Sequence, residues 1–295
     1  MEIISSENKK IKPDDYNTPH FPTWCPGCGN FAIWAALKNA LTELKLPVHR
    51  VIVVFGIGCS GNFNNFLKAY VFHALHGRAL PVGVGAKLSN HELDVIVIGG
   101  DGDGYAEGLN HFVQTLRTNI NITYLVHNNH VYSLTTGQAS PTSVSGFKSK
   151  TTPAGAFEYP LNPLALAVSA GGSFIARGFA GDIPHLTGLI KQGIIHKGFS
   201  YIDIMQPCPT FNPDLSYDWY RKRVYKLDET GYVADNRFKA WEKSQEPFEQ
   251  KIPTGVFYRE DRPILEQNYP QLAKKPLTSS DLDKNEWQQL LENYR

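Results

Sequence analysis

The sequence has no long apolar run and no excess of charge of either sign. Its 295 residues carry 29 Lys and Arg against 28 Asp and Glu, which gives a formal net charge of +1. Apolar runs are short, such as Val51–Phe55, whereas a membrane-spanning helix needs about 20 apolar residues. Nucleic acid or an acidic membrane surface would require a basic excess or patch. We therefore expect neither nucleic acid nor membrane as a partner. The first residues lack an apolar signal core, which predicts a cytoplasmic protein.

Cysteine is also scarce, because the chain has only Cys25, Cys28, Cys59 and Cys208. A reducing cytosol disfavours disulfides between them. The closely spaced run of cysteines typical of a ferredoxin is missing, so the chain could hold one iron–sulfur cluster at most. Four cysteines are enough for a tetrahedral zinc site or for one iron–sulfur cluster. Cys25 and Cys28 could instead form a dithiol redox pair.

Strand-like and helix-like patterns alternate between about residues 21 and 212, with no internal repeat. They predict an α/β fold with an open, mostly parallel sheet and helices on both faces. Residues 1–20 are interpreted as an N-terminal arm, and residues 213–295 as an irregular C-terminal extension that wraps the domain or a partner subunit. We predict strands at 51–55, 95–98, 122–126, 173–176 and 201–205, and helices from Asn30 and at 64–75, 105–118, 163–170 and 183–196.

An unusual cluster of residues follows each of four predicted strands. The carboxyl ends of parallel strands form the ligand-binding edge of an open sheet, so these clusters are expected to form one site. They are Gly56–Gly61, Gly99–Gly104, His127–His130 and Gln206–Pro209.

The Gly99–Gly104 turn is the most informative of these clusters. Glycines allow the backbone to approach an anion, and the helix that follows directs its N-terminal N–H groups at the same point. Two aspartates, Asp101 and Asp103, would repel a bare diphosphate. A Mg²⁺ ion shared between a carboxylate and phosphate oxygens resolves this conflict, and Asn128-Asn129 offers an amide oxygen on the same edge.

Gly100-Asp101-Gly102, followed after 25 residues by Asn128-Asn129, resembles the signature of thiamine-diphosphate enzymes. The resemblance implies that Asp101, Asn129 and the backbone carbonyl of Val131 bind Mg²⁺. The alternative is an acidic glycine turn with an unrelated asparagine pair.

A more specific resemblance covers Trp24 to Asn212. It is carried by Cys25-Pro-Gly-Cys28-Gly, Gly56-Ile-Gly-Cys59-Ser, His76-Gly-Arg-Ala-Leu-Pro81, Gly100-Asp-Gly-Asp103 and Tyr132-Ser-Leu-Thr-Thr-Gly-Gln-Ala-Ser-Pro-Thr142. Together these motifs resemble the β subunit of 2-oxoacid:ferredoxin oxidoreductases, which implies a domain at residues 21–212 that binds both thiamine diphosphate and a 4Fe–4S cluster. The cluster ligands would be Cys25, Cys28, Cys59 and Cys208.

The resemblance also implies an activity and partners. The expected reaction is oxidative decarboxylation of a 2-oxoacid, pyruvate or 2-oxoglutarate, with coenzyme A to acyl-CoA and CO₂, and electrons pass through the cluster to ferredoxin. No glutamate is suitably placed to activate thiamine, since Glu107 lies at the diphosphate end, so an α subunit should supply it in an αβ heterodimer or a dimer of heterodimers.

Several further residues are candidates for cofactor contact. Gly58, Cys59 and Ser60 follow a strand beside the expected pocket, and His76 is either a thiamine or diphosphate contact or an ordinary core histidine. Asp103 either bonds the cofactor or caps the helix. Leu134 is expected to wedge beneath the thiamine rings, with ordinary packing as the alternative.

Two positions depart from the resembled pattern. Ser133 stands where glycine is common. Thr136 stands where relatives that use 2-oxoglutarate carry lysine, so it is a possible specificity residue that favours pyruvate or a broader range. Two other functions stay open: a non-oxidative thiamine-dependent decarboxylase or carboligase with a structural zinc site, and a non-catalytic scaffold stabilised by zinc.

Overall fold

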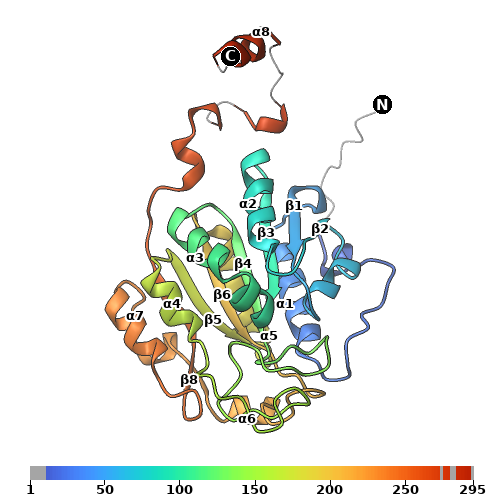
Figure 1. Ribbon diagram of the computed structural model, residues 1–295, viewed down its shortest axis with the longest axis vertical. Coiled ribbons are helices and arrows are strands. Elements are labelled where there is room, and N and C mark those ends of the chain that lie inside the picture. Colours follow the sequence, from blue (N-terminus) through green and yellow to red (C-terminus); the bar gives the residue numbers. More distant parts are fainter. Residues whose placement is uncertain (1–10, 273–274, 280–283, 294–295) are drawn as a thin grey trace.

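The computed structural model describes residues 11–272, 275–279 and 284–293, and its centre is one mixed sheet (Figure 1). The strands lie in the order β2-β1-β3-β4-β6-β5-β8-β7. All neighbouring pairs are parallel except β5 and β8. The strands are β1 (Val51–Phe55), β2 (Tyr70–His73), β3 (Asp94–Gly100), β4 (Thr123–Asn128), β5 (Phe174–Phe179), β6 (Ser200–Met205), β7 (Val224–Lys226) and β8 (Ile252–Arg259). The predicted open, mostly parallel sheet is confirmed.

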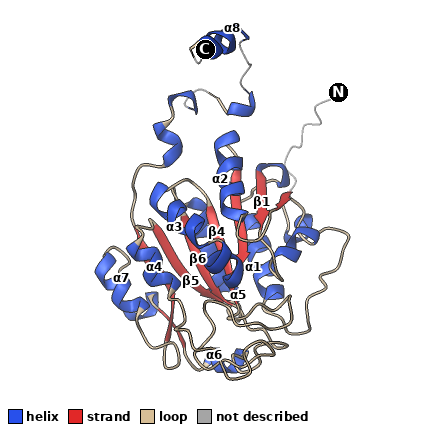
Figure 2. Ribbon diagram, in the orientation of Figure 1, coloured by secondary structure: helices blue, strands red, loops and turns tan. Residues whose placement is uncertain are grey.

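Helices cover both faces of the sheet (Figure 2). The helices of the described ranges are α1 (Asn30–Glu43), α2 (Ala79–Ser89), α3 (Leu109–Thr118), α4 (Pro163–Ser169), α5 (Ile183–Ile195), α6 (Tyr217–Arg221), α7 (Arg237–Ser244) and α8 (Lys284–Glu292). One apolar core contains buried residues of α1 and α5, and the other contains buried residues of α2, α3, α4 and α7. None of these helices combines the length and hydrophobicity needed to cross a membrane.

The two cores follow from the alternation of side chains along each strand. In β1, Val53 lies in the α1 and α5 core, whereas Val54 lies in the opposite core. In β3, Ile96 lies in the α1 and α5 core, and Val97 lies in the opposite core. Apolar residues at consecutive positions are therefore required, as is typical of a parallel strand covered on both faces.

The sequence-based prediction was wrong between β1 and β3. Residues 64–75 were expected to be helical, but they contain the end of a 3₁₀ turn at Gly61–Asn65 and the edge strand β2. The helix in this part of the chain is α2, which was missed because its glycines resemble loop sequence. Gly83 packs against the sheet so closely that a Cβ would lie 2.6 Å from Val97 Cγ2. Here glycine permits close helix–sheet packing.

The helix predicted at 105–118 also begins differently. A π-helical turn at Asp103–Glu107 precedes α3. The side chains of Phe112 and Leu116 are fully buried, whereas Leu109 and Val113 are partly exposed. The face expected to point inward does so, and the irregular turn lies where the candidate site requires the chain to bend.

The C-terminal extension is more regular than expected. Its strand β8 pairs with β5 in the central sheet, and α7 packs on α4. A third apolar cluster joins Phe179 and Met205 of the sheet to Leu215, Tyr220 and Ile252 of the extension. The extension therefore packs on the domain, whereas a contact with a partner subunit and the boundaries at residues 20 and 212 stay predictions. Figure 1 shows α8 beyond one end of the sheet, away from the other helices.

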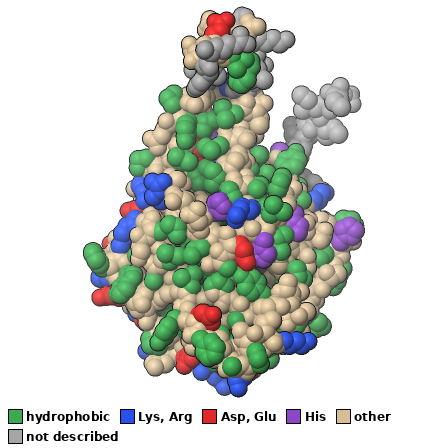
Figure 3. Space-filling view, viewed as in Figure 1, with side chains coloured by type: hydrophobic (Ala, Val, Ile, Leu, Met, Phe, Trp, Pro, Cys, Tyr) green, Lys and Arg blue, Asp and Glu red, His purple; other side chains and the backbone are tan. Residues whose placement is uncertain are grey.

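The strand register brings the candidate loops together. Phe55 is opposite both His73 and Ile98, Gly100 is opposite His127, and Asn128 is opposite Met205. The chain leaves β1, β2, β3, β4 and β6 at the same edge of the sheet. On the face seen in Figure 3, hydrophobic side chains, histidines and charges of both signs are interspersed.

Candidate cofactor and cysteine sites

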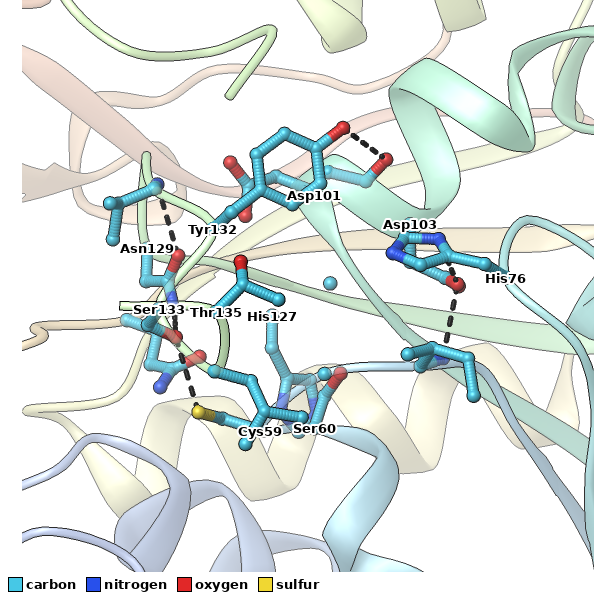
Figure 4. A pocket seen from close by; sticks show the side chains of 17 residues that line it. Cys59, Ser60, His76, Asp101, Asp103, His127, Asn129, Tyr132, Ser133 and Thr135 are labelled. Carbon is cyan, nitrogen blue, oxygen red and sulfur yellow. Dashed lines mark hydrogen bonds and ion pairs between the residues drawn. The ribbon is translucent and has the colours of Figure 1, made fainter. Parts of the chain in front are cut away.

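A cavity lies at the carboxyl edge of the strands, between the loops that follow β1, β2, β3 and β4 (Figure 4). Every residue that the sequence predicted to contact the thiamine cofactor lines it. These residues are Gly58, Cys59, Ser60, His76, Gly100, Asp101, Gly102, Asp103, Asn129, Val131 and Leu134. The predicted convergence of these loops is therefore present in the structure.

Asp101 is the buried acid of this cavity. Its Oδ2 atom accepts hydrogen bonds from Ser140 Oγ at 2.6 Å and from Thr142 Oγ1 at 2.7 Å. Burial raises the pKa of this carboxyl, although the two hydroxyl groups and the nearby His130 oppose the effect. A buried carboxylate held by neutral hydroxyl donors is suited to a divalent cation, because the cation compensates the charge that burial disfavours.

The turn after β4 directs alternate side chains to opposite sides. Asn129 and Val131 line the cavity, whereas Asn128 and His130 line a separate cavity behind the turn. His130 has a φ of +59°, a left-handed conformation that allows the chain to bend here. Asn129 Oδ1 accepts from the Val131 N–H at 3.1 Å, which fixes the orientation of the amide. Both residues of this turn that were predicted to bind Mg²⁺ thus line the first cavity.

Asp103 joins three loops. Its Oδ1 accepts hydrogen bonds from the N–H groups of Ile57 at 3.0 Å and Gly77 at 2.9 Å, and lies 3.2 Å from His76 Nδ1. The cap position of the following helical turn is occupied by Gly102, and Asp103 is the first residue of that turn. Of the two roles expected for Asp103, helix capping is wrong. Its carboxylate holds the walls of the cavity together instead.

Glycine is required where the loops meet most closely. A Cβ at Gly56 would lie 1.9 Å from Asp103 Oδ2, and one at Gly102 would lie 2.2 Å from the ring of Tyr132. A larger residue at either position would separate the loops. Close packing of the loops therefore explains why glycine stands at positions 56 and 102.

The four cysteines line a second cavity, with a volume of about 150 Å³. Three separate loops bring them together, because Cys25 and Cys28 precede α1, Cys59 follows β1 and Cys208 follows β6. The Gly29 N–H donates to the Pro207 carbonyl at 3.1 Å, which joins the first and last of these loops. Within the described ranges, no three His, Cys, Asp or Glu side chains are arranged to hold a single metal ion.

For three of the thiols, burial outweighs the hydrogen bonds that favour the thiolate. Burial raises the pKa of Cys28 to about 12 and also raises the pKa values of Cys59 and Cys208. Gln206 Nε2 lies 3.4 Å from Cys28 Sγ, and Ser133 Oγ lies 3.2 Å from Cys59 Sγ. Cys25 is exposed. Metal ligation requires thiolates, so an iron–sulfur group or a metal bound here would have to displace these protons.

The two cavities share a wall. Cys59, Ser133 and Leu134 line both of them. Leu134 is half-exposed, as a side chain facing open cavities should be. A group held by the cysteines would therefore lie directly beside a group held in the first cavity.

The first cavity also contains four residues that belong to the predicted clusters and motifs but had no individual role assigned to them: His127, Tyr132, Thr135 and Gln206. His127 is fully buried, and burial lowers its pKa to about 3. Its Nδ1 lies 2.8 Å from Asn30 Oδ1, and its Nε2 has no hydrogen-bond partner among the described residues. Its position, at the end of a strand just before the asparagine pair, was the signal that could have found it.

Thr136 does not line the first cavity. It is exposed at a φ of +78°, and its neighbour Thr135 faces the cavity instead. Glu107 is also at the rim, where it lies 3.3 Å from His76 Nδ1 and accepts a hydrogen bond from Tyr132. Neither residue projects into the cavity between the predicted magnesium ligands.

Residues 56–204 match the family model described as "Thiamine pyrophosphate enzyme, C-terminal TPP binding domain". The fold and the first cavity therefore define a thiamine-diphosphate-binding domain. Residues 208–274 match a second model, which describes the C-terminal part of the beta chain of pyruvate ferredoxin oxidoreductase.

β subunits of 2-oxoacid oxidoreductases from other organisms are similar to this chain over most of its length. The 2-oxoacid:ferredoxin oxidoreductase subunit beta of Saccharolobus solfataricus is 47% identical over 250 residues, which cover 81% of this chain and 82% of that protein. The 2-oxoglutarate synthase subunit KorB of Methanocaldococcus jannaschii is 33% identical, covering 87% and 94%.

A solved 2-oxoglutarate:ferredoxin oxidoreductase from Magnetococcus marinus, with 2-oxoglutarate, coenzyme A and succinyl-CoA bound, has a TM-score of 0.89, 36% identity and 97% coverage of each chain. The chain belongs to the β-subunit family of the 2-oxoacid:ferredoxin oxidoreductases.

Proposed function

We propose that this chain binds thiamine diphosphate through Mg²⁺ and one 4Fe–4S cluster through its four cysteines. Together with an α subunit it would oxidise a 2-oxoacid with coenzyme A to acyl-CoA and CO₂, with ferredoxin as electron acceptor. The observation that carries this proposal is the wall formed by Cys59, Ser133 and Leu134, which separates the two cavities. Adjacent cavities suit a reaction whose electrons must leave the thiamine site.

The residues of the first cavity have distinct tasks in this proposal. Asp101, Asn129 and the Val131 carbonyl would hold Mg²⁺, which in turn holds the diphosphate. Thiamine diphosphate, when bound, would stabilise the negative charge that develops as a 2-oxoacid loses CO₂. Leu134 supports the rings, and Asp103 keeps the surrounding loops in contact through Ile57 and Gly77.

The cysteine cavity favours a cluster over zinc. Zinc–sulfur bonds are about 2.3 Å long, so four cysteines converge closely around one ion. The cavity of about 150 Å³ that all four cysteines line has room for several heavy atoms. A 4Fe–4S cluster fills such a space and accepts single electrons, whereas zinc has no redox role.

An α subunit is needed to complete the site. Asp101 and Asp103 are the carboxylates among the described lining residues, and both are occupied by hydrogen bonds within the chain. The glutamate that activates thiamine would come from the partner. The same partner would close the open side of the cavity and complete an αβ heterodimer or its dimer.

The substrate is proposed as a 2-oxoacid, with pyruvate and 2-oxoglutarate both candidates. Thr136 offers no positive charge to the distal carboxylate of 2-oxoglutarate, and its exposed position outside the cavity limits its influence. Relatives named for 2-oxoacids and for 2-oxoglutarate are both similar to this chain. The missing charge would then come from arginines or lysines of the α subunit.

The test is to purify the chain without oxygen, together with its α subunit, and to record the visible spectrum with iron and sulfide assays. A broad absorbance that dithionite bleaches, with about four irons per β chain, is expected for a cysteine-bound 4Fe–4S cluster. A colourless complex with stoichiometric zinc would overturn the oxidative function and leave the non-oxidative decarboxylase or carboligase.

Thiamine binding is tested separately with Asp101→Ala. The variant should lose Mg²⁺-dependent binding of thiamine diphosphate, measured by calorimetry on the complex. Ser89→Ala, on the exposed side of α2, is the matched control because, among the described residues, its hydroxyl hydrogen-bonds only to the Gly85 carbonyl, at 2.8 Å. Unchanged binding by Asp101→Ala would contradict the proposed magnesium site, and a wild-type complex that binds no thiamine diphosphate would favour a non-catalytic scaffold.

A further inference from the structure

Ser133 lies between the two proposed sites and contacts a proposed ligand of each. Its Oγ is 3.1 Å from Asn129 Nδ2 and 3.2 Å from Cys59 Sγ (Figure 4). The side chain is buried, with an exposed fraction of 6%, and lines both cavities. A continuous path of two hydrogen bonds therefore connects the proposed magnesium ligand to a proposed cluster ligand.

The direction of both hydrogen bonds is determined by their surroundings. Asn129 Oδ1 accepts from the Val131 N–H, so the NH₂ end of the amide faces Ser133 and must donate. The Ser133 hydroxyl accepts this bond, and its single proton is free to point at the sulfur. Asn129 is thus the first donor, and Cys59 is the final acceptor.

We propose that Ser133 is a positioning residue that links occupation of the magnesium site to the reduction potential of the cluster, an inference that rests on the proposed function. Asn129 Oδ1 has two lone pairs, so it can bind a cation while it still accepts from Val131. An amide whose oxygen is bound to a cation is a stronger N–H donor. Hydrogen bonds in a chain polarise one another, so Ser133 in turn donates more strongly to Cys59.

The sign of the effect follows from charge. Reduction adds an electron to the cluster and its thiolates, so a donor to Cys59 stabilises the reduced form more than the oxidised form. Hydrogen bonds to sulfur are among the factors that set cluster potentials. The Ser133 hydroxyl therefore raises the potential, and it raises it further when Mg²⁺ and thiamine diphosphate are bound. The cluster therefore accepts electrons more readily when Mg²⁺ and thiamine diphosphate occupy the first cavity.

The chain contains a matched control outside both cavities. Ser200 is also buried, and its hydroxyl donates to the Gly193 carbonyl at 2.7 Å. Ser200→Ala removes a buried hydroxyl that lines neither cavity. Ser133→Ala removes the contact to the Cys59 sulfur, and Ser133→Thr keeps a hydroxyl at the same position.

The experiment is a potentiometric titration of the anaerobically purified complex, followed by electron paramagnetic resonance of the reduced cluster. Each protein is titrated with and without Mg²⁺ and thiamine diphosphate. We expect the wild-type potential to rise when the cofactor is added. Ser133→Ala should have a lower potential and lose most of that rise, whereas Ser133→Thr and Ser200→Ala should resemble the wild type.

The outcomes separate the inference from the proposed function. A wild-type complex without iron would overturn the proposed function itself. A wild-type cluster whose potential is unchanged by the cofactor would overturn the linkage, and this comparison requires no variant. Ser133→Ala with a full cluster and an unaltered potential would overturn the role of the hydroxyl. If Ser133→Ala assembles no cluster, the titrations of Ser133→Thr and of the wild type still show whether the cofactor raises the cluster potential.

Discussion

The Gly77 N–H donates a hydrogen bond of 2.9 Å to the carboxylate of Asp103, across 26 residues of sequence. The same Oδ1 atom accepts from the Ile57 N–H at 3.0 Å. One buried carboxylate thus joins the loops after β1 and β2 to the turn after β3. The cavity depends on this contact, because each of the three loops forms part of its wall.

Asp103→Ala should therefore destabilise the chain and loosen the cavity. Losing hydrogen bonds to a charged group, with two N–H donors left without a partner, costs about 2–4 kcal/mol. We expect a lower free energy of unfolding in urea and weaker binding of thiamine diphosphate. Asp103→Asn retains an acceptor oxygen, so it should lose less stability and less affinity for thiamine diphosphate. Two variants with equal losses would show that the hydrogen-bond acceptor at Oδ1 is unimportant.

The loops with the strongest local signals were predicted correctly. Gly99–Gly104 and the cysteine motifs combine unusual residues with a position after a strand, and parallel strand order brings those positions together. The edge strand β2 and the helix α2 were not predicted, because packing determines them. All four residues of β2 are exposed, so no pattern of buried positions marks the strand, and α2 uses Gly83 to approach Val97.

Contacts between distant residues were also beyond sequence reasoning. Ser133 and Cys59 are 74 positions apart, and their hydrogen bond depends on the relative placement of the loops after β1 and β4. His127 and Asn30 are 97 apart, and either residue alone has an ordinary interpretation as a core or cap residue. A single sequence indicates which residues can bind a group, but not which neighbours orient them.

His196 should make stability depend on pH. It is buried, its Nε2 lies 2.9 Å from Ser173 Oγ, and burial lowers its pKa from 6.5 to about 4. Between these values the unfolded chain binds a proton that the folded chain does not. Stability is thus fully present above pH 6.5 and falls as the pH decreases toward 4, with a slope of at most about 1.4 kcal/mol per pH unit.

The measurement is the unfolding temperature of wild type and His196→Gln between pH 4.5 and 7.5. The variant retains a side-chain donor for Ser173 but cannot titrate in this range, so its curve should be flatter. Above pH 6.5, the difference in unfolding temperature between the two proteins reports only the change in packing. Parallel curves over the whole range would mean that His196 does not contribute to the acid sensitivity.

Two tryptophans give a matched test of the cysteine site. Trp24 Nε1 donates to the Cys59 carbonyl at 2.8 Å, and Trp34 Nε1 donates to the Phe66 carbonyl at 3.1 Å. Replacing either by phenylalanine removes one hydrogen bond, worth about 1 kcal/mol. Only Trp24→Phe releases the backbone of a cysteine. It should therefore speed the loss of cluster absorbance in the presence of an iron chelator, whereas Trp34→Phe should not. Equal rates of loss in the two variants would show that the Trp24 hydrogen bond does not help to retain the cluster.

Thr136→Lys tests whether an exposed loop residue affects substrate choice. Thr136 has a φ of +78°, and its N–H donates to the Ser133 carbonyl at 3.1 Å. A lysine at this position has a long, flexible chain that could bring a positive charge to the cavity mouth beside Thr135. The expected result is a higher ratio of kcat/KM for 2-oxoglutarate to that for pyruvate. Asn110→Lys on the exposed surface of α3 adds the same charge elsewhere and should leave the ratio unchanged. If Thr136→Lys also leaves it unchanged, position 136 has no part in specificity, and the discriminating charge must come from the α subunit.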